Sequence, residues 1–264
     1  MSSPIGVFDS GIGGLTVVKA LRDLLPREDI FYIGDTARIP YGSKSPSTVE
    51  RYSVEIARLL LAENAKAIVV ACNSASSVAL PRLRAEVSVP VIGVIEPGAM
   101  AAAKATRNNR VGVIGTRATI KSGSYEKALR EKNASVQVTA QACPLLVPLI
   151  EEGWLDDEIT DSAIARYLAP LTKSDIDTLV LGCTHYPLLR AAFARHLGAG
   201  VTLVDSAQNC AHAVAAMLQE KQIASSNGGK LTVALTDKPD AFLEIARDSL
   251  QLDLGEILLR DPTR

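Results

Sequence analysis

Short apolar runs alternate with longer segments of helical periodicity along most of this chain. The runs lie at residues 5–8, 30–33, 67–71, 91–95, 111–114, 136–140, 178–181 and 201–204. Most lack alternating polar residues, as is typical of strands that helices cover on both faces. Between them, residues 16–25 and 48–63 carry apolar residues every three or four positions. This alternation predicts an α/β fold built on mostly parallel sheets.

The second half of the chain repeats features of the first half in the same order. Residues 5–10 are Ile-Gly-Val-Phe-Asp-Ser, and residues 111–116 are Val-Gly-Val-Ile-Gly-Thr. Later in each half an apolar strand ends in a cysteine, Cys72 or Cys183. We therefore expect two pseudo-symmetric lobes, each a mostly parallel sheet flanked by helices, with a site in the cleft between them.

The lobe boundary is expected near residues 96–98, Glu-Pro-Gly, which indicate a turn after the fourth strand. Beyond residue 206 we expect a helix at 211–222 and a last strand at 231–235. That strand could join either sheet, so the first lobe need not be contiguous in sequence.

Composition excludes several classes of protein. The 28 Lys and Arg residues balance 29 Asp and Glu residues, so the chain lacks the basic surface of a non-specific nucleic-acid binder. Apolar runs stay short of the ~18 residues of a membrane span, and the N-terminus does not resemble an export signal. Four cysteines in 264 residues are too few for a disulfide scaffold, so we expect reduced thiols and a cytoplasmic protein.

Polar residues cluster where the expected strands end, which is where open α/β sheets bind ligands. They are Asp9, Ser10, Asp35, residues 72–74, Thr116, residues 183–185 and Asp205. If the lobes are related by a pseudo-twofold axis, Cys72 and Cys183 face each other across one cleft. Each precedes an expected helix, whose N-terminus can lower a thiol pKa from ~8.5 towards neutrality. Cys143 lies among apolar residues and is expected to be packing.

Two opposed thiols allow three kinds of chemistry. They could form a redox disulfide, although neither lies in a Cys-x-x-Cys motif. They could bind zinc, because Cys183-x-His185 and Cys210-x-His212 repeat one pattern, but residues two apart on a helix diverge. They could also act as an acid and a base on opposite faces of one carbon, which inverts a stereocentre without a cofactor.

The glycine-rich segment 9–16 follows a strand and opens a helix, as a dinucleotide-binding loop does. The third glycine of that fingerprint is replaced by Thr16, and Asp9 would place a carboxylate beside a pyrophosphate. We therefore expect a glycine-rich turn in which Asp9 suits a substrate ammonium group.

Four segments together resemble the motif set of bacterial glutamate racemases, in the Asp/Glu racemase superfamily. They are residues 9–14 (Asp-Ser-Gly-Ile-Gly-Gly), 35–42 (Asp-Thr-Ala-Arg-Ile-Pro-Tyr-Gly), 71–76 (Ala-Cys-Asn-Ser-Ala-Ser) and 181–188 (Leu-Gly-Cys-Thr-His-Tyr-Pro-Leu). The resemblance extends from the N-terminus to about residue 206 and includes Pro-Leu-Ile-Glu at 148–151. Four motifs in the right order are highly specific.

This resemblance implies a racemase that uses two cysteine bases and no pyridoxal phosphate or other cofactor, and no metal. It implies a first lobe of residues 1–96 and 207–264 and a second lobe of residues 97–206. The implied bases are Cys72 and Cys183, acting on D-glutamate and L-glutamate respectively, with Asp9, His185 and Glu151 as catalytic helpers. The implied substrate-binding residues are Asp9, Ser10, Tyr41, Gly42, Asn73, Ser74, Thr116, Thr119, Thr184 and His185.

Further expectations concern partners and regulation. The family usually has threonine where this chain has Ser74, so the hydroxyl is retained and a methyl group is lost. The chain begins almost at the first motif, which argues against activation by a peptidoglycan precursor through an N-terminal extension. We expect a homodimer that supplies D-glutamate for peptidoglycan. Its expected binding partner is the small-molecule substrate, and neither nucleic acid nor a membrane is expected as a partner. The alternatives are a racemase of another acidic amino acid such as aspartate, a two-lobed protein that binds a small anion, and a zinc hydrolase.

Overall fold

Two parallel sheets form the framework of the chain in a computed structural model that describes residues 3–237 and 249–262. The strands of the first sheet are β1 (Ile5–Asp9), β2 (Ile30–Gly34), β3 (Ala67–Val70), β4 (Val91–Gly93), β9 (Leu231–Leu235) and β10 (Ile257–Leu259). The strands of the second sheet are β5 (Arg110–Gly115), β6 (Gln137–Ala142), β7 (Thr178–Gly182) and β8 (Thr202–Asp205). Every pairing between these strands is parallel. The predicted α/β class is confirmed.

Helices connect consecutive strands and cover the sheets. The α-helices are α1 (Leu15–Leu24), α2 (Pro46–Ala62), α3 (Asn73–Val78), α4 (Leu80–Glu86), α5 (Ile95–Ala105), α6 (Arg117–Lys121), α7 (Ser124–Lys132), α8 (Leu146–Glu151), α9 (Glu158–Lys173), α10 (Arg190–Leu197) and α11 (Ser206–Glu220). The 3-10 helices are η1 (Thr36–Arg38), η2 (Tyr41–Ser43) and η3 (Tyr186–Leu189). Residues next to the start of helix α2 determine where it begins. The Ser45 side chain accepts a hydrogen bond from Thr48 N, and Pro46 occupies the first turn.

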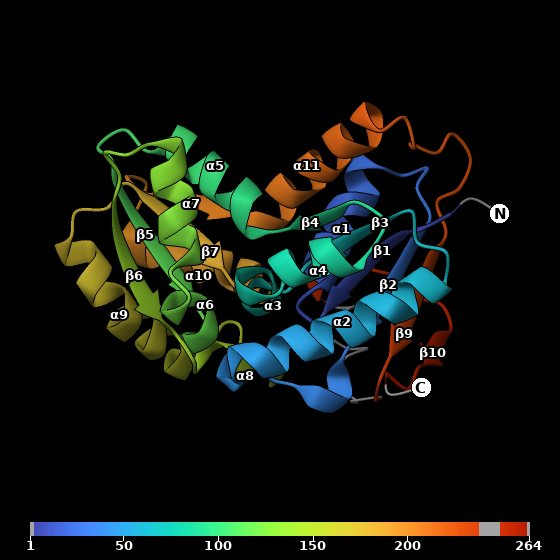
Figure 1. Cartoon of the computed structure of the whole chain (residues 1–264). Coiled ribbons are helices and arrows are strands. Elements are labelled where there is room, and N and C mark those ends of the chain that lie inside the picture. Colours follow the sequence, from blue (N-terminus) through green and yellow to red (C-terminus); the bar gives the residue numbers. More distant parts are fainter. Residues whose placement is uncertain (1–2, 238–248, 263–264) are drawn as a thin grey trace.

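The two sheets share one strand order, which confirms the predicted pseudo-symmetry. The first sheet contains the order β2-β1-β3-β4, and the second is β6-β5-β7-β8, so each lobe begins at a central strand and winds outward in the same sense. In Figure 1 the second sheet lies on the left and the first on the right, with α3 and α6 between them. The order reverses beside β1 and β5, which is where ligands bind in folds of this class.

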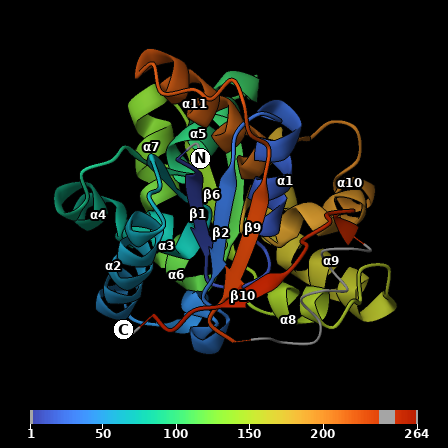
Figure 2. The same cartoon turned by 90° about the vertical axis from the view of Figure 1, so that its right-hand side faces the viewer.

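The strands of the first sheet bury both faces. Val7 packs with residues of α1 and α11, whereas the next residue, Phe8, packs with residues of α2. Figure 2 shows α1 and α2 on opposite sides of β1, β2 and β9. Successive side chains of a strand point to opposite faces, so a layer of helices on each side accounts for apolar runs without polar alternation.

The C-terminal part of the chain returns to the first sheet. Strand β9 pairs with β2 in parallel, and β10 adds beyond β9, so residue 231 lies beside Ile30, some 200 positions earlier in sequence. The buried Lys66–Glu28 ion pair supports this return, because Lys66 Nζ also donates to Ile223 O at 2.7 Å. The expected lobe limits at residues 96 and 207 stay a prediction.

Three sequence expectations are wrong in detail. Residues 96–98 lie in the first turn of α5, where proline is tolerated because the N–H that it lacks would have no helical partner there. Strand β9 is followed by a further strand, β10, so 231–235 is not the last. The helix expected after Cys183 is a 3-10 segment, η3, followed by α10, so Cys183 does not directly precede an α-helix.

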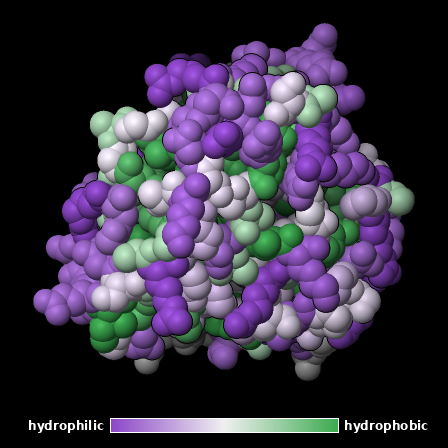
Figure 3. Space-filling model, turned by 90° about the vertical axis from the view of Figure 1, so that its left-hand side faces the viewer, coloured by the Kyte–Doolittle hydropathy of each residue, from purple (hydrophilic) through white to green (hydrophobic). Residues whose placement is uncertain are grey.

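The surface is mixed in character. The face in Figure 3 shows hydrophobic residues in small groups among hydrophilic ones. The larger exposed apolar side chains include Leu145, Trp154 and Ile159, which lie at or near α8 and α9. Within the described ranges, 3–237 and 249–262, none of the helices combines the length and the hydropathy that a membrane crossing requires.

Candidate active site

The carboxyl ends of β1, β3, β5 and β7 meet at one cavity of about 370 Å³. Its wall contains both cysteines that were singled out, Cys72 from the first lobe and Cys183 from the second. The other wall residues predicted from sequence are Ser10, Tyr41, Gly42, Asn73, Ser74, Glu151, Thr116, Thr184 and His185. The strand ends therefore bring together residues that are more than 170 positions apart in sequence.

Two predicted residues lie behind the cavity wall. Asp9 is fully buried; its carboxylate accepts hydrogen bonds from Gly11 N at 3.0 Å and from the Thr184 hydroxyl at 3.4 Å. Thr119 is 1% exposed and donates its backbone N–H to Thr116 Oγ1, so it supports a wall residue. Neither side chain is part of the wall itself.

Cys72 occupies the N-cap position of α3 and lies against Ser10, whose Oγ is 3.7 Å from the Cys72 Sγ. Burial, followed by the charge of Asp9, raises the pKa of the Cys72 thiol to about 12. The expected lowering by the helix N-terminus is therefore wrong for Cys72, because desolvation and a nearby carboxylate outweigh the dipole of one short helix. Cys72 is a neutral thiol here.

Cys183, His185 and Glu151 form a chain of contacting side chains, called the relay below. Its Sγ is 3.8 Å from His185 Nδ1, and His185 Nε2 is 3.1 Å from Glu151 Oε1. Burial alone lowers the pKa of His185, but the hydrogen bonds and charges of Cys183 and Glu151 outweigh it and raise that pKa to about 10. An imidazolium between a carboxylate and a sulfur is the electropositive setting in which a thiol becomes reactive.

The first lobe holds the Cys183 loop in place. Thr16 Oγ1 lies within hydrogen-bond distance of Thr184 O at 3.0 Å. Gly13 lies so close to the loop that a Cβ built on it would be 2.4 Å from both His185 Nδ1 and Thr184 Oγ1. The glycine-rich turn therefore serves close packing against this loop.

The second lobe holds the Cys72 loop in the same way. Ser74 Oγ is 2.9 Å from Thr116 Oγ1, and Thr116 also caps α6 by accepting from Thr119 N at 3.2 Å. Gly42 packs against Thr116, where an added Cβ would lie 2.7 Å from the Thr116 Cβ. Each cysteine loop is thus supported by side chains of the opposite lobe.

A buried polar cluster positions Tyr41 in the wall. The Tyr41 hydroxyl donates to Asp35, and Arg38 Nε donates to the same carboxylate at 2.7 Å. Burial, followed by the charge of Asp35, raises the pKa of Tyr41 well above its usual value. Asp35, noted from sequence as a strand-end carboxylate, therefore has its oxygens engaged by protein donors.

Sequence reasoning missed part of the wall. The residues not predicted are Ile39, Pro40, Ser43, Arg117, Pro144, Val147 and Pro148. A signal existed for four of them, because Ile39 and Pro40 lie in the quoted segment 35–42, Arg117 directly follows Thr116 and Pro148 opens the quoted segment 148–151. The others are apolar or small residues of the kind found on any loop.

The described residues offer little to a metal ion. Across 3–237 and 249–262, no three His, Cys, Asp or Glu side chains gather in a possible metal site. Cys210 is fully buried in the first-lobe core, whereas His212, two positions later on α11, is exposed. The repeated Cys-x-His pattern is therefore not a shared site. All four cysteines are free thiols.

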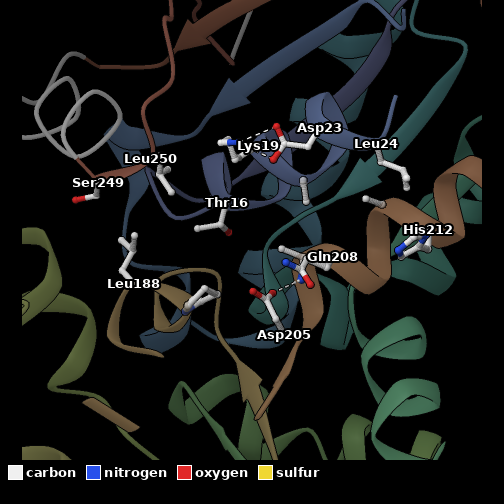
Figure 4. A pocket seen from close by; sticks show the side chains of 14 residues that line it. Thr16, Lys19, Asp23, Leu24, Leu188, Asp205, Gln208, His212, Ser249 and Leu250 are labelled. Carbon is white, nitrogen blue, oxygen red and sulfur yellow. Dashed lines mark hydrogen bonds and ion pairs between the residues drawn. The ribbon is translucent and has the colours of Figure 1, made fainter. Parts of the chain in front are cut away.

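A second cavity, of about 470 Å³, lies between α1, η3 and the start of α11. Figure 4 shows Lys19 and Asp23 of α1 on one side, paired at 2.5 Å, with Asp205 and His212 on another. Thr16 lines this cavity and contacts the Thr184 carbonyl, so the second cavity lies behind the Cys183 loop.

Comparison with known proteins agrees with this arrangement. Residues 14–216 match the family model described as Asp/Glu/Hydantoin racemase. A glutamate racemase of Geobacter metallireducens is 49% identical over 255 residues, which cover 96% of this chain and 94% of that protein. A crystal structure of a glutamate racemase isoform from Bacillus anthracis is 42% identical with a TM-score of 0.94, covering 98% of this chain and 97% of that one. The structure of glutamate racemase from Francisella tularensis in complex with D-glutamate is 36% identical with a TM-score of 0.93, covering 99% and 98%.

Proposed function

The chain belongs to the Asp/Glu/hydantoin racemase family, and we propose that it is a glutamate racemase that interconverts L-glutamate and D-glutamate with two thiols and no cofactor. One observation carries the proposal. Cys72 and Cys183 follow equivalent strands of two sheets with the same strand order, and both line one cavity. An enzyme that inverts a stereocentre needs a proton acceptor and a proton donor on opposite faces of one carbon.

The neutral Cys72 thiol suits the role of proton donor in the reaction of L-glutamate. Cys183 lies beside the cationic His185 and takes the proton from Cα, while the neutral Cys72 thiol gives its proton to the opposite face. One C–H bond breaks and one forms, and the two sulfurs exchange protonation states. D-glutamate then reacts in reverse, with Cys72 as the base.

A thiolate is a weak base for an α-proton, so the site must also stabilise the developing carbanion. Three uncharged donors line the cavity and can stabilise that charge, namely the Asn73 amide and the hydroxyls of Ser74 and Thr184. All three residues are at least 96% buried, and hydrogen bonds to a carboxylate are stronger when water is excluded.

The wider setting is part of the proposal. Free thiols at all four cysteines fit a reducing compartment, so we place the enzyme in the cytoplasm. D-glutamate is the product that peptidoglycan synthesis would consume. The exposed apolar side chains of Leu145, Trp154 and Ile159 support a homodimer, since burial of exposed apolar side chains favours association.

The test is circular dichroism of L-glutamate with purified enzyme in deuterium oxide, with reductant and chelator but without pyridoxal phosphate. We expect the optical signal to decay to zero while proton NMR shows deuterium entering at Cα. L-aspartate is the matched substrate control and should react far more slowly. Folded protein that leaves both amino acids unchanged would refute the proposal.

A further inference from the structure

The orientation of the Asn73 side-chain amide determines what this residue can bind. It lines the cavity immediately after Cys72, is 2% exposed, and carries a carbonyl acceptor and an NH₂ donor on one amide. Only the NH₂ group can bind a substrate carboxylate, so binding requires the amide to be held one way round.

Tyr125 holds the amide in that orientation. Its hydroxyl donates to Asn73 Oδ1 at 2.7 Å. Burial raises the pKa of Tyr125 above its usual value, so the phenol keeps the proton that it donates. Asn73 Nδ2 is buried and has no hydrogen-bond partner in the described part of the chain. A buried donor without a partner is costly, and a ligand that supplies the acceptor recovers that cost.

The Tyr125 ring is itself fixed by its surroundings. It is 3% exposed; a Cβ at Gly182 would lie 3.1 Å from the ring, and one at Gly98 would lie 3.4 Å from it. The preceding residue, Ser124, donates from its hydroxyl to Ser77 O at 2.9 Å, which attaches the start of α7 to α3. Tyr125 therefore reaches from the residue before Cys183 to the residue after Cys72.

We propose that Tyr125 is a positioning residue that orients the Asn73 amide so that its NH₂ group binds a carboxylate of the amino-acid substrate. The inference rests on the proposed function for the identity of that substrate. Tyr125 does not touch the substrate and acts only through Asn73. Its main contribution is to affinity, because the carboxylate is bound in both the ground state and the transition state, and only the extra charge that develops in the transition state adds a smaller effect on kcat.

The experiment compares Tyr125→Phe with the wild type. We expect KM for both glutamate enantiomers to rise about tenfold, with kcat changed by less than about threefold, because the freed amide can turn its oxygen towards the carboxylate. The matched control is Tyr167→Phe, which removes a hydroxyl that accepts from Leu145 N at 3.4 Å and does not line the cavity. Its KM should stay within about twofold of the wild type. A KM within about twofold for Tyr125→Phe, or a fall in kcat larger than the rise in KM, would overturn the inference.

A double-mutant cycle separates positioning from general destabilisation. In an Asn73→Ala background, Tyr125→Phe should cause no further rise in KM, since the two residues act in series. The double variant also leaves neither hydrogen-bonding group without its partner, so it tests the inference even if Tyr125→Phe alone folds poorly. Independent, multiplicative effects would contradict the proposal.

Asn73→Asp tests the orientation directly. Tyr125 can still donate to one carboxylate oxygen, which leaves the other oxygen facing the substrate. We expect a larger rise in KM than Asn73→Ala causes, because repulsion is added to the lost donor. A smaller rise would contradict the proposed orientation.

Calorimetric binding of D-glutamate distinguishes this inference from the proposed function. If the wild type binds D-glutamate without racemising it, the function fails, and the ratio of Kd values for Tyr125→Phe and wild type still decides the inference. If the wild type neither binds nor racemises glutamate, both are overturned.

Discussion

The two cysteine loops occupy equivalent places in the two lobes but differ in electrostatic character. After Cys72 come an amide and a hydroxyl, Asn73 and Ser74, and the nearest charge is the carboxylate of Asp9. After Cys183 come Thr184 and His185, and His185 contacts Glu151. The fold's symmetry places the two sulfurs, while residues that break the symmetry give the two thiols different electrostatic surroundings.

One substitution between the lobes accounts for much of this difference. Asp9 is the fifth residue of the Ile-Gly-Val-Phe-Asp-Ser segment, and the matching position of the second lobe is Gly115. A carboxylate near Cys72 favours its neutral form, whereas the second lobe has no carboxylate at that point and instead gains an imidazolium. The neutral Cys72 thiol is therefore expected to act as the proton donor when L-glutamate reacts.

The electrostatic difference between the two cysteine loops cannot appear in every kinetic constant. Two enantiomers have equal free energy, so kcat/KM must be the same in both directions for the wild type and for every variant. The difference between the lobes must instead be sought in half-reactions and in pH profiles.

Replacement of either cysteine should have the largest effect. Cys72→Ser and Cys183→Ser should each lower racemisation by about 10³- to 10⁴-fold, because each removes one of two obligatory proton-transfer groups. Circular dichroism measures this loss. Equal losses are expected, since inversion requires both faces.

Deuterium exchange in the same variants separates the two lobes. Cys72→Ser should still exchange the α-proton of L-glutamate without inversion through Cys183, whereas Cys183→Ser should exchange only D-glutamate. NMR of each enantiomer in deuterium oxide reports the exchange. The opposite preference would reverse the assignment of the cysteines to the enantiomers.

Gly13→Ala should have the next largest effect. The added Cβ would collide with His185 Nδ1 and Thr184 Oγ1, each at 2.4 Å, and displace the Cys183 loop. A displacement of about 1 Å at a catalytic group costs about 100-fold in rate, which sets the expected loss in kcat/KM. Gly200→Ala is the control, because nothing lies within 4 Å of its added Cβ. Wild-type activity in Gly13→Ala would show that the first lobe does not position this loop.

Glu151→Gln should act on the pH profile more than on the maximal rate. The carboxylate helps to hold the pKa of His185 at about 10, and loss of an opposing charge of this kind shifts a pKa by about 1–3 units. We expect the alkaline limb of the kcat profile to move to lower pH. An alkaline limb at the same pH as in the wild type would show that Glu151 does not influence the pKa of His185.

The same pair of groups predicts a trend in stability. The folded-state pKa of His185 lies above its unfolded value of ~6.5, so the protonated form stabilises the folded state. That contribution is fully present below about pH 6.5 and is lost as the pH rises through about 10. Thermal unfolding across this range should therefore show a steeper decline for the wild type than for Glu151→Gln.

The sequence best predicted those features that depend on residues close together along the chain. Apolar runs located nine of the described strands, and strand-end positions located Cys72 and Cys183, because parallel strands present their carboxyl ends at one edge. Strand β10 was missed, since Ile257–Leu259 is too short to stand out. The raised pKa of Cys72 was also missed, because it depends on burial and on Asp9, which is distant in sequence.

Contacts between the lobes could not be predicted from the sequence, because they join residues that are distant along the chain. Tyr125 was not singled out, since nothing in its own segment indicates that its hydroxyl reaches Asn73. Asp9 and Thr119 were placed among the substrate-binding residues, and the structure puts both behind the wall. Motif patterns identify the loops of a site, but they do not say which side chain of a loop faces the cavity.

Ser74 should show the smallest effect and gives the sharpest contrast with His185. The two residues occupy equivalent positions, two after Cys72 and Cys183 respectively, but Ser74 contributes only a hydroxyl that lies 2.9 Å from Thr116 Oγ1. Ser74→Ala should cost about 0.5–1.5 kcal/mol in unfolding free energy and raise KM several-fold, as expected for one neutral hydrogen bond. Ser74→Thr keeps the hydroxyl and should change KM by less than Ser74→Ala does. If Ser74→Ala instead lowered kcat as strongly as loss of His185, the first lobe would contain a catalytic relay of its own, and the asymmetry argued from Asp9 and His185 would not hold.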